Sequence, residues 1–153
     1  DLCEFQSGKY QLFNNDILKM KMNPKELTIG AWVLSDNELA RIISLERRNN
    51  KLYVEAHVYD GTCEENIDEI ALLPEGIMPL PVTEELLTKN GWKRCKCPAN
   101  CFVHPKLGEK NMIQFTKSGA IIHKVKVKYV HQVQNVIRLF NTDLSIELQL
   151  FKI

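Results

Sequence analysis

The sequence lacks the features that mark several large classes of protein. Its 153 residues contain no apolar run close to the roughly 20 residues that a membrane-spanning helix needs. The N-terminal stretch has no basic segment followed by an apolar one, which is the pattern of a secretory signal. We therefore expect a chain that stays out of membranes and works in the cytoplasm.

Catalytic motifs of known mechanism are also missing. The chain has no G-x-S-x-G turn for a nucleophilic serine, no H-E-x-x-H zinc helix and no glycine-rich phosphate loop. The acidic residues between 60 and 69 are too irregularly spaced for a calcium loop, which needs alternate oxygen ligands, a central glycine and a distal glutamate. These absences favour a protein that is not an enzyme.

The five cysteines are an odd number, and three of them fall within seven residues, which is unlike the disulfide framework of a secreted protein. We expect reduced thiols. Three interpretations are open for the loop that holds them: a structural zinc site, a redox-active thiol, or ordinary loop cysteines, which the compact spacing favours. The zinc ligands would be Cys95, Cys97, Cys101 and His104.

Charge is unevenly distributed, although the formal net charge is only +1. Residues 55–85 hold nine acidic side chains and no Lys or Arg, whereas residues 93–128 hold nine basic side chains and one acid, Glu109. Such a chain has a negative and a positive region, and the positive region permits an anionic partner.

The first half of the chain predicts a small antiparallel sheet. Residues 31–34 are a short apolar run, and two stretches rich in β-branched and aromatic residues flank Asn49-Asn50, which suits a hairpin turn. A turn at Asp60-Gly61 and a strand over 67–73 follow. Three or four short strands within fifty residues indicate a barrel-like sheet similar to Src-homology-3 domains.

The prolines at 74, 79 and 81 predict the end of that sheet, because proline lacks the N–H that a central strand donates. We therefore expect an extension or docked arm over 1–23, a barrel-like subdomain over 24–81, and an α+β subdomain over 82–153 that packs with it as one unit.

The second half predicts a helix, a loop, a hairpin, a second helix and a final strand. Thr83 suits the N-cap of the first helix and Gly91 its C-terminal end. Residues 93–111 are expected to form a loop. Alternation on both sides of Ser118-Gly119 predicts a hairpin, an apolar stripe from Tyr129 to Phe140 predicts a helix, and strict alternation over 144–151 predicts a strand.

The predicted hairpin has a basic face formed by Lys124, Lys126 and Lys128, with Lys110 and Lys117 nearby. Two interpretations are open. These lysines could contact the phosphates of a nucleic acid, or they could be a solvated face that protects a strand edge, which the lack of interleaved aromatic residues favours.

The stretch KYVHQVQNVIRLF places His131, Gln134 and Asn135 on one side of the second helix. The imidazole of His131 could act as an acid, a base or a ligand near neutral pH. The alternative, which we favour, is that these side chains brace neighbouring strands and turns.

Three segments occur in order: KELTIGAWVL (25–34), IDEIALLPEGIMPLPVTEELLTKNGW (67–92) and YVHQVQNVIRLF (129–140). Together they resemble a family of small uncharacterised proteins from gut Bacteroidetes and their phages or integrated elements. Members of that family read R-I-G-N-W-V, I-P-L-T-E-E-x-L-x-x-x-G-F and Y-V-H-Q-L-Q-N-L. The resemblance spans residues 24 to about 150, and it implies a role in a mobile element without implying an activity. Ala31 departs from the pattern, and the cysteine-rich loop is not part of it.

These features lead to one main hypothesis: a non-enzymatic binding module or accessory protein of a phage or mobile element. The predicted binding residues are His131, Gln134, Asn135, Lys124 and Lys126, and the partner would be a protein or a nucleic acid. The alternatives are a small hydrolase or nuclease-like enzyme that uses His131, and a purely structural interaction protein. We expect a monomer, or a weak homodimer formed through residues 144–151.

Overall fold

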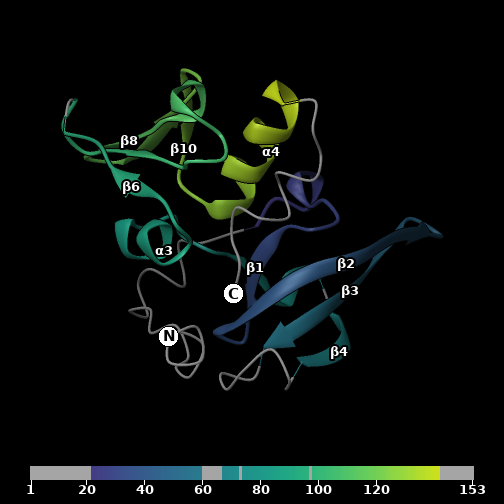
Figure 1. Cartoon of the computed structure of the whole chain (residues 1–153). Coiled ribbons are helices and arrows are strands. Elements are labelled where there is room, and N and C mark those ends of the chain that lie inside the picture. The colour runs from purple at the N-terminus through teal and green to yellow at the C-terminus, as the bar shows by residue number, and fades with distance from the viewer. Residues whose placement is uncertain (1–21, 60–66, 73, 97, 142–153) are drawn as a thin grey trace. The chain divides into compact units, whose positions relative to one another are not determined.

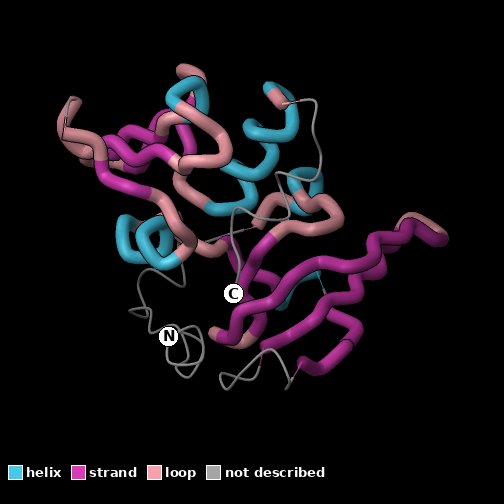
Figure 2. Tube along the Cα trace, viewed as in Figure 1, coloured by secondary structure: helices cyan, strands magenta, loops and turns pink. Residues whose placement is uncertain are grey.

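The structure, a computed structural model, describes residues 22–59, 67–72, 74–96 and 98–141. It is an α+β protein with two antiparallel sheets (Figures 1 and 2). The chain divides into two compact units, Asp1–Leu80 and Pro81–Lys152, and each is described by itself. The predicted α+β class is confirmed, whereas the predicted domain boundaries and their packing as one unit stay predictions.

The first unit contains a five-stranded sheet in the order β4-β3-β2-β1-β5. Its strands are β1 (Trp32–Ser35), β2 (Glu38–Arg48), β3 (Lys51–Tyr59), β4 (Ile67–Leu72) and β5 (Ile77–Pro79). Short 3-10 helices, η1 (Pro24–Glu26) and η2 (Pro74–Gly76), precede β1 and β5. The sheet is barrel-like in its strand order, but no hydrogen-bonded pairing among the described residues closes it between β4 and β5.

Two-residue turns set the register of the first three strands. Asn49 and Asn50 both have positive φ, as the predicted hairpin requires, and they join Arg48 to its partner Lys51. A second turn of the same kind, at Asp36 and Asn37, joins β1 to β2. Positive φ at both central residues is the type I′ geometry, whose twist matches that of the strands. The turn at Asp36 was not predicted from the sequence.

The inner face of this sheet holds the apolar core of the first unit. Because side chains alternate along a strand, Ala40 and Ile42 of β2 face the same side as Val58 and Ala56, their partners on β3. Leu27, Ala31, Val33, Val54 and Ile77 complete this cluster.

The prediction that the prolines break the ladder is wrong for Pro79, although the sheet ends with β5. Pro79 is the last residue of β5 and pairs with Val33 of β1. This is compatible with proline chemistry because β5 is an edge strand, and an edge strand has one side on which no N–H is needed for the ladder.

The second unit contains a five-stranded sheet in the order β10-β9-β8-β7-β6. The strands are β6 (Lys93–Arg94), β7 (Cys101–Val103), β8 (Ile113–Thr116), β9 (Gly119–Ile122) and β10 (Val125–Val127). The prediction of a loop over 93–111 is therefore wrong in part, since β6, β7 and the 3-10 helix η3 (Glu109–Asn111) lie within it. These strands are two and three residues long, too short to produce a detectable alternation.

The hairpin around Ser118-Gly119 is confirmed, but its second arm is not one strand. His123 and Lys124 have φ of 48° and 64° and form a further tight turn between β9 and β10. The usual Asn or Gly is absent from this turn, so the sequence carried no signal for it. Lys124 consequently lies in a turn and not on the strand face predicted for it.

Helix α3 (Glu84–Lys89) ends as its sequence predicts. The hydroxyl of Thr83 accepts a hydrogen bond from the backbone N–H of Leu86, which caps the first turn. At the other end the N–H groups of Gly91 and Trp92 donate to the carbonyls of Thr88 and Leu87. This pair of bonds is the Schellman motif, and it needs the positive φ of 87° that Gly91 adopts.

Helix α4 (Val130–Phe140) has Tyr129 as its N-cap residue and Asn141 as its C-cap residue. The apolar stripe predicted its buried face, since Val130, Val133, Val136 and Ile137 are buried. Phe140, the last member of that stripe, is instead 56% exposed.

Among the helices that the structure describes, none has the length and apolar character needed to cross a membrane. Residues 1–21, the turn at Asp60-Gly61 and the predicted strand over 144–151 lie outside the described residues.

Candidate functional site

Two of the polar side chains predicted to bind from helix α4 are buried. His131 is 1% exposed and Gln134 is 2% exposed, while Asn135 is half-buried. The imidazole of His131 lies nearly parallel to the ring of Tyr129, with centroids 5.9 Å apart. A buried imidazole and a buried amide offer no surface to a partner, so the bracing role is favoured for both, and a binding role for Asn135 stays a prediction.

The neighbouring side chain of Gln132 organises the start of helix α4. Its Oε1 accepts hydrogen bonds from the backbone N–H groups of Lys128 and Tyr129, at 2.8 and 3.2 Å. Gln132 is the third residue of α4, and its side chain reaches back to the N–H of the N-cap residue Tyr129 and of the residue before it, as the side chain at that position does in a capping box. The contact fixes the end of β10 against the first turn of the helix.

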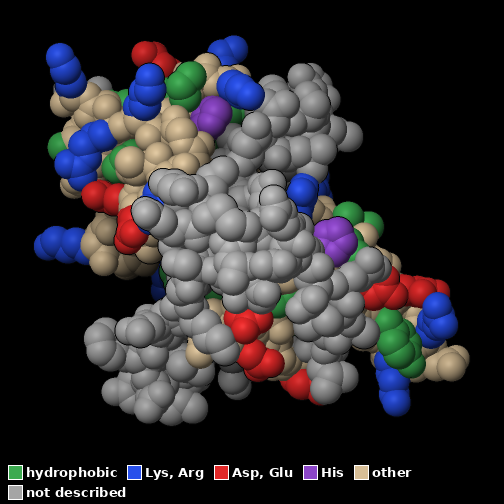
Figure 3. All heavy atoms as spheres, turned by 60° about the horizontal axis from the view of Figure 1, so that its bottom comes forward, with side chains coloured by type: hydrophobic (Ala, Val, Ile, Leu, Met, Phe, Trp, Pro, Cys, Tyr) green, Lys and Arg blue, Asp and Glu red, His purple; other side chains and the backbone are tan. Residues whose placement is uncertain are grey.

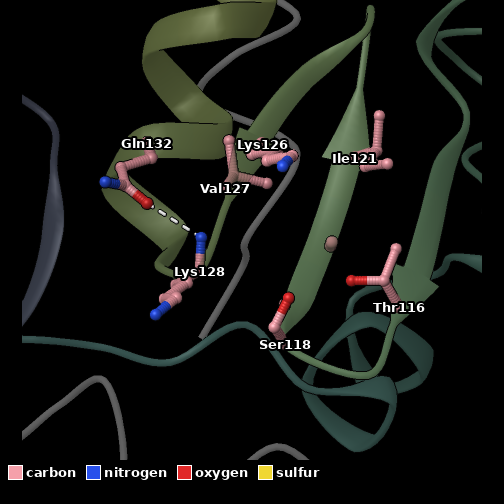
Figure 4. Close-up of a pocket in the computed structure, with 9 residues that line it drawn as sticks. Thr116, Ser118, Ile121, Lys126, Val127, Lys128 and Gln132 are labelled. Carbon is pink, nitrogen blue, oxygen red and sulfur yellow. Dashed lines mark hydrogen bonds between the residues drawn. The ribbon is translucent and has the colours of Figure 1, made fainter.

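A groove of about 430 Å³ opens beside this junction, entirely within the second unit (Figure 4). Its walls come from the end of β8, the β8–β9 turn, strands β9 and β10 and the first turn of α4. The lining residues are Thr116, Ser118, Gly119, Ala120, Ile121, Lys126, Val127, Lys128 and Gln132.

The register of the sheet places the side chain of Lys126 on its exposed face. Lys126 pairs with Ile121 of β9, and Ile121 pairs with Gln114 of β8. Paired residues in neighbouring strands project to the same face, so these three side chains stand on one side of the sheet. The adjacent pair, Val127 and Ala120, projects to the other face and is buried, and it also contributes to the groove lining.

Gly119 sets the shape of the groove through a close approach of backbone segments. A Cβ atom placed on Gly119 would lie 2.7 Å from the carbonyl oxygen of Val127 and 3.2 Å from Cγ of Lys128. Only glycine allows β9 and the end of β10 to come this close without one of them shifting. The hydroxyl-bearing residues Thr116 and Ser118 lie on the opposite side of the groove from Gln132 (Figure 4).

The groove is positively charged. It contains two lysines and no carboxylate. The printed sequence places eleven Lys or Arg and three Glu in residues 81–141, and Figure 3 shows Lys and Arg side chains spread over the second unit at the upper left. Two of the glutamates form ion pairs with other residues: Glu84 pairs with Arg94, and Glu85 pairs with Lys89.

Two lysines line the groove and two more, Lys117 and Lys124, lie in the turns of the same hairpins. Among the described residues, no ion pair joins Lys117, Lys124, Lys126 or Lys128 to a carboxylate. All four are exposed. The arrangement combines ammonium groups, hydroxyl donors and an apolar floor, which are suited to holding a phosphate group or a chain of them.

The cysteine-rich loop does not form a metal centre from its described residues. Within the part of the chain that the structure describes, no three His, Cys, Asp or Glu side chains gather closely enough to hold a metal ion. Cys97, one of the four predicted ligands, lies outside the described residues. The sulfur of Cys101 is buried and donates toward the carbonyl of Ala99 at 3.6 Å.

Another predicted ligand, His104, is held as a neutral imidazole. Its Nδ1 accepts a hydrogen bond from the backbone N–H of Lys106 at 3.1 Å, so the ring proton is on Nε2. Burial lowers the pKa of His104, a hydrogen bond with the backbone of Asn90 opposes that shift, and the charge of Lys106 adds to it. The ring also packs edge-on against Trp92, at 5.5 Å between centroids, which indicates a structural role.

The predicted binding set is thus only partly brought together. Lys126 lines the groove, Lys124 stands on the neighbouring turn, and the other three residues belong to helix α4. The sequence did not predict that Thr116, Ser118 and Gly119 line a groove. The one available signal was the Ser118-Gly119 turn next to a basic strand.

In comparisons with known proteins, the chain matches no protein-family model, no curated protein and no solved structure. The functional conclusion therefore depends on the geometry and charge of the groove.

Proposed function

We propose that this protein is a non-enzymatic binding module whose second unit holds the phosphate backbone of a nucleic acid. The observation that carries the proposal is the groove at β9 and β10, where Lys126 and Lys128 stand beside two hydroxyl side chains with no carboxylate in the lining. Lysines facing a groove of this kind bind a polyanion by releasing its counterions.

The resemblance to small proteins of gut Bacteroidetes and their phages or integrated elements is part of the same proposal. Its three segments are residues 25–34, 67–92 and 129–140. An accessory protein of a mobile element works in the cytoplasm, where the DNA and RNA of that element are present. The burial of His131 speaks against the alternative of a hydrolase that uses this side chain.

The test is fluorescence anisotropy with labelled single-stranded and duplex oligonucleotides, titrated at low salt and again at rising salt. The double variant K126E/K128E removes two contacts and should weaken binding by roughly tenfold or more. It should also make the salt dependence shallower by about 1.4 in the slope of log K against log salt for a single strand, since each phosphate contact contributes about 0.7.

The matched control is K25E/K51E, which makes the same change in net charge at two exposed lysines of the first unit. This control should keep wild-type affinity to within a small factor. Failure of the wild-type chain to bind at low salt would refute the proposal, and so would an equal loss in both double variants.

A further inference from the structure

An exposed aromatic ring stands at the far end of the same hairpin. Phe140, the last residue of α4, is stacked on His123 of the β9–β10 turn, with centroids 4.1 Å apart and planes 7° from parallel. Phe140 is 56% exposed, so part of the ring faces solvent. A large apolar side chain thus lies in a stack at the surface and not in the core.

The stack is held in place by a hydrogen-bond network. Nε2 of His123 lies 2.7 Å from Oδ1 of Asn111. The same oxygen accepts a hydrogen bond from Nδ2 of Asn141 at 3.1 Å, and Nδ2 of Asn111 donates to the carbonyl of Leu107. These bonds assign Oδ1 of Asn111 as the acceptor, and therefore Nε2 of His123 as the donor.

The network also caps the C-terminal end of α4, the helix that carries Phe140. Asn141, the C-cap residue of α4, donates from Nδ2 to the carbonyl of Ile137 at 2.7 Å. Asn111 is buried, at 3% exposed, so the anchor of the network is protected from water. A flat ring fixed in this way loses little conformational freedom when a second flat group stacks on it.

The stack and the groove share the β9–β10 hairpin. His123 and Lys124 form the turn that leads into β10, and β10 carries Lys126 to the groove. Gln132, which lines the groove, and Phe140 are eight residues apart in α4, or about 12 Å at the helical rise. A short stretch of nucleic-acid backbone is long enough to reach both.

We propose that Phe140, stacked on His123, is a base-stacking subsite, and that the ligand of this protein is single-stranded nucleic acid. The inference rests on the proposed function, since it takes the lysines of the groove as the phosphate contacts. An exposed ring can accept only a base that is free of its own stack, which a single strand offers and a regular duplex does not. Ring-on-base stacking also makes the site tolerant of sequence.

The experiment compares three probes by anisotropy: a short oligo-dT, an oligomer of the same length and charge built from abasic sites, and a duplex. The wild-type chain should bind oligo-dT roughly tenfold more tightly than the abasic oligomer. Phe140→Ala and Phe140→Leu should both erase that difference and leave binding of the abasic oligomer unchanged.

The control variant is Leu139→Ala. Leu139 is the neighbouring residue and is 81% exposed, so its truncation removes a similar apolar side chain without removing a ring. It should keep the preference for oligo-dT. The double variant K126E/K128E should weaken both single-stranded probes by the same factor.

The outcomes separate the two proposals. Equal binding of oligo-dT and the abasic oligomer by the wild-type chain, or a duplex bound as tightly as oligo-dT, would overturn the stacking subsite while leaving the phosphate groove intact. No binding of any probe at low salt would overturn both, and would turn attention to an acidic protein partner.

Discussion

Replacing Gly119 by alanine tests the geometry on which the groove depends. The added Cβ would meet the carbonyl oxygen of Val127 at 2.7 Å, which is closer than real Cβ contacts allow, and it would crowd Cγ of Lys128 at 3.2 Å. The first of these atoms is backbone, so the conflict cannot be relieved by turning a side chain. Either β9 and β10 move apart or the turn before Gly119 distorts.

In other proteins, adding a group to a well-packed site lowers the unfolding free energy by about 1–3 kcal/mol, and we expect a similar loss here. For a domain of 60–100 residues each kcal/mol lowers the melting temperature by roughly 4–8 °C. We therefore expect Gly119→Ala to melt clearly below the wild-type chain by differential scanning calorimetry. It should also weaken binding of oligo-dT, because the displaced Lys128 lines the groove.

Gly76 is the matched control. A Cβ at Gly76 would have no neighbour within 4 Å, and Gly76 is not among the residues with positive φ. Gly76→Ala should leave the melting temperature unchanged or raise it slightly, because alanine restricts the unfolded chain more than glycine does. A Gly119→Ala protein that melts at the wild-type temperature would show that the two strands do not approach as described.

Two further predictions concern the second unit. His104 has a lowered pKa because it is buried, so as the pH drops below about 6.5 the unfolded chain takes up a proton before the folded chain does. The unfolding free energy should therefore decrease as the pH is lowered, by up to about 1.4 kcal/mol per pH unit, until the folded chain is protonated as well. Urea titrations followed by tryptophan fluorescence should show this loss of unfolding free energy in the wild-type chain and a smaller loss in His104→Asn. An identical pH dependence in both proteins would contradict the assignment of the effect to His104. Thr83→Ala removes the N-cap of α3 and should cost about 1 kcal/mol in the same titration. Thr88→Ala, which removes an exposed hydroxyl bonded to the carbonyl of Glu84, is its control and should cost less; equal costs would argue against a capping role.

Local sequence signals predicted much of the fold. The asparagine pair at 49 and 50, the Thr83 cap and the Gly91 end each act through the backbone of their own few residues, and each lies where the sequence placed it. Elements without such signals were missed. β6 and β7 are held by pairing with strands brought near by the fold, and the turn at His123 and Lys124 lacks the Asn or Gly that usually marks a two-residue turn.

The candidate site was only partly predictable. Alternation identified Lys126 as an outward residue of a basic strand, because the period of a strand is a local property. It could not show that Thr116 and Ser118 lie across from Gln132, since that depends on how closely β9 approaches the end of β10. The same limit applies to His131, whose position on the polar-looking side of a helix did not reveal that the side chain is buried.

The sequence by itself determined the α+β class, the positions of the helix ends and two hairpin turns, and the concentration of positive charge in the second half of the chain. Each of these follows from backbone preferences, side-chain periodicity or residue counts, which do not require knowledge of distant neighbours. Only the tertiary structure decided which polar side chains are buried, that lysines and hydroxyls line one groove, and that Phe140 stacks on His123. Those facts depend on contacts between residues far apart in sequence, and pairing in space is fixed only when the strands and helices pack.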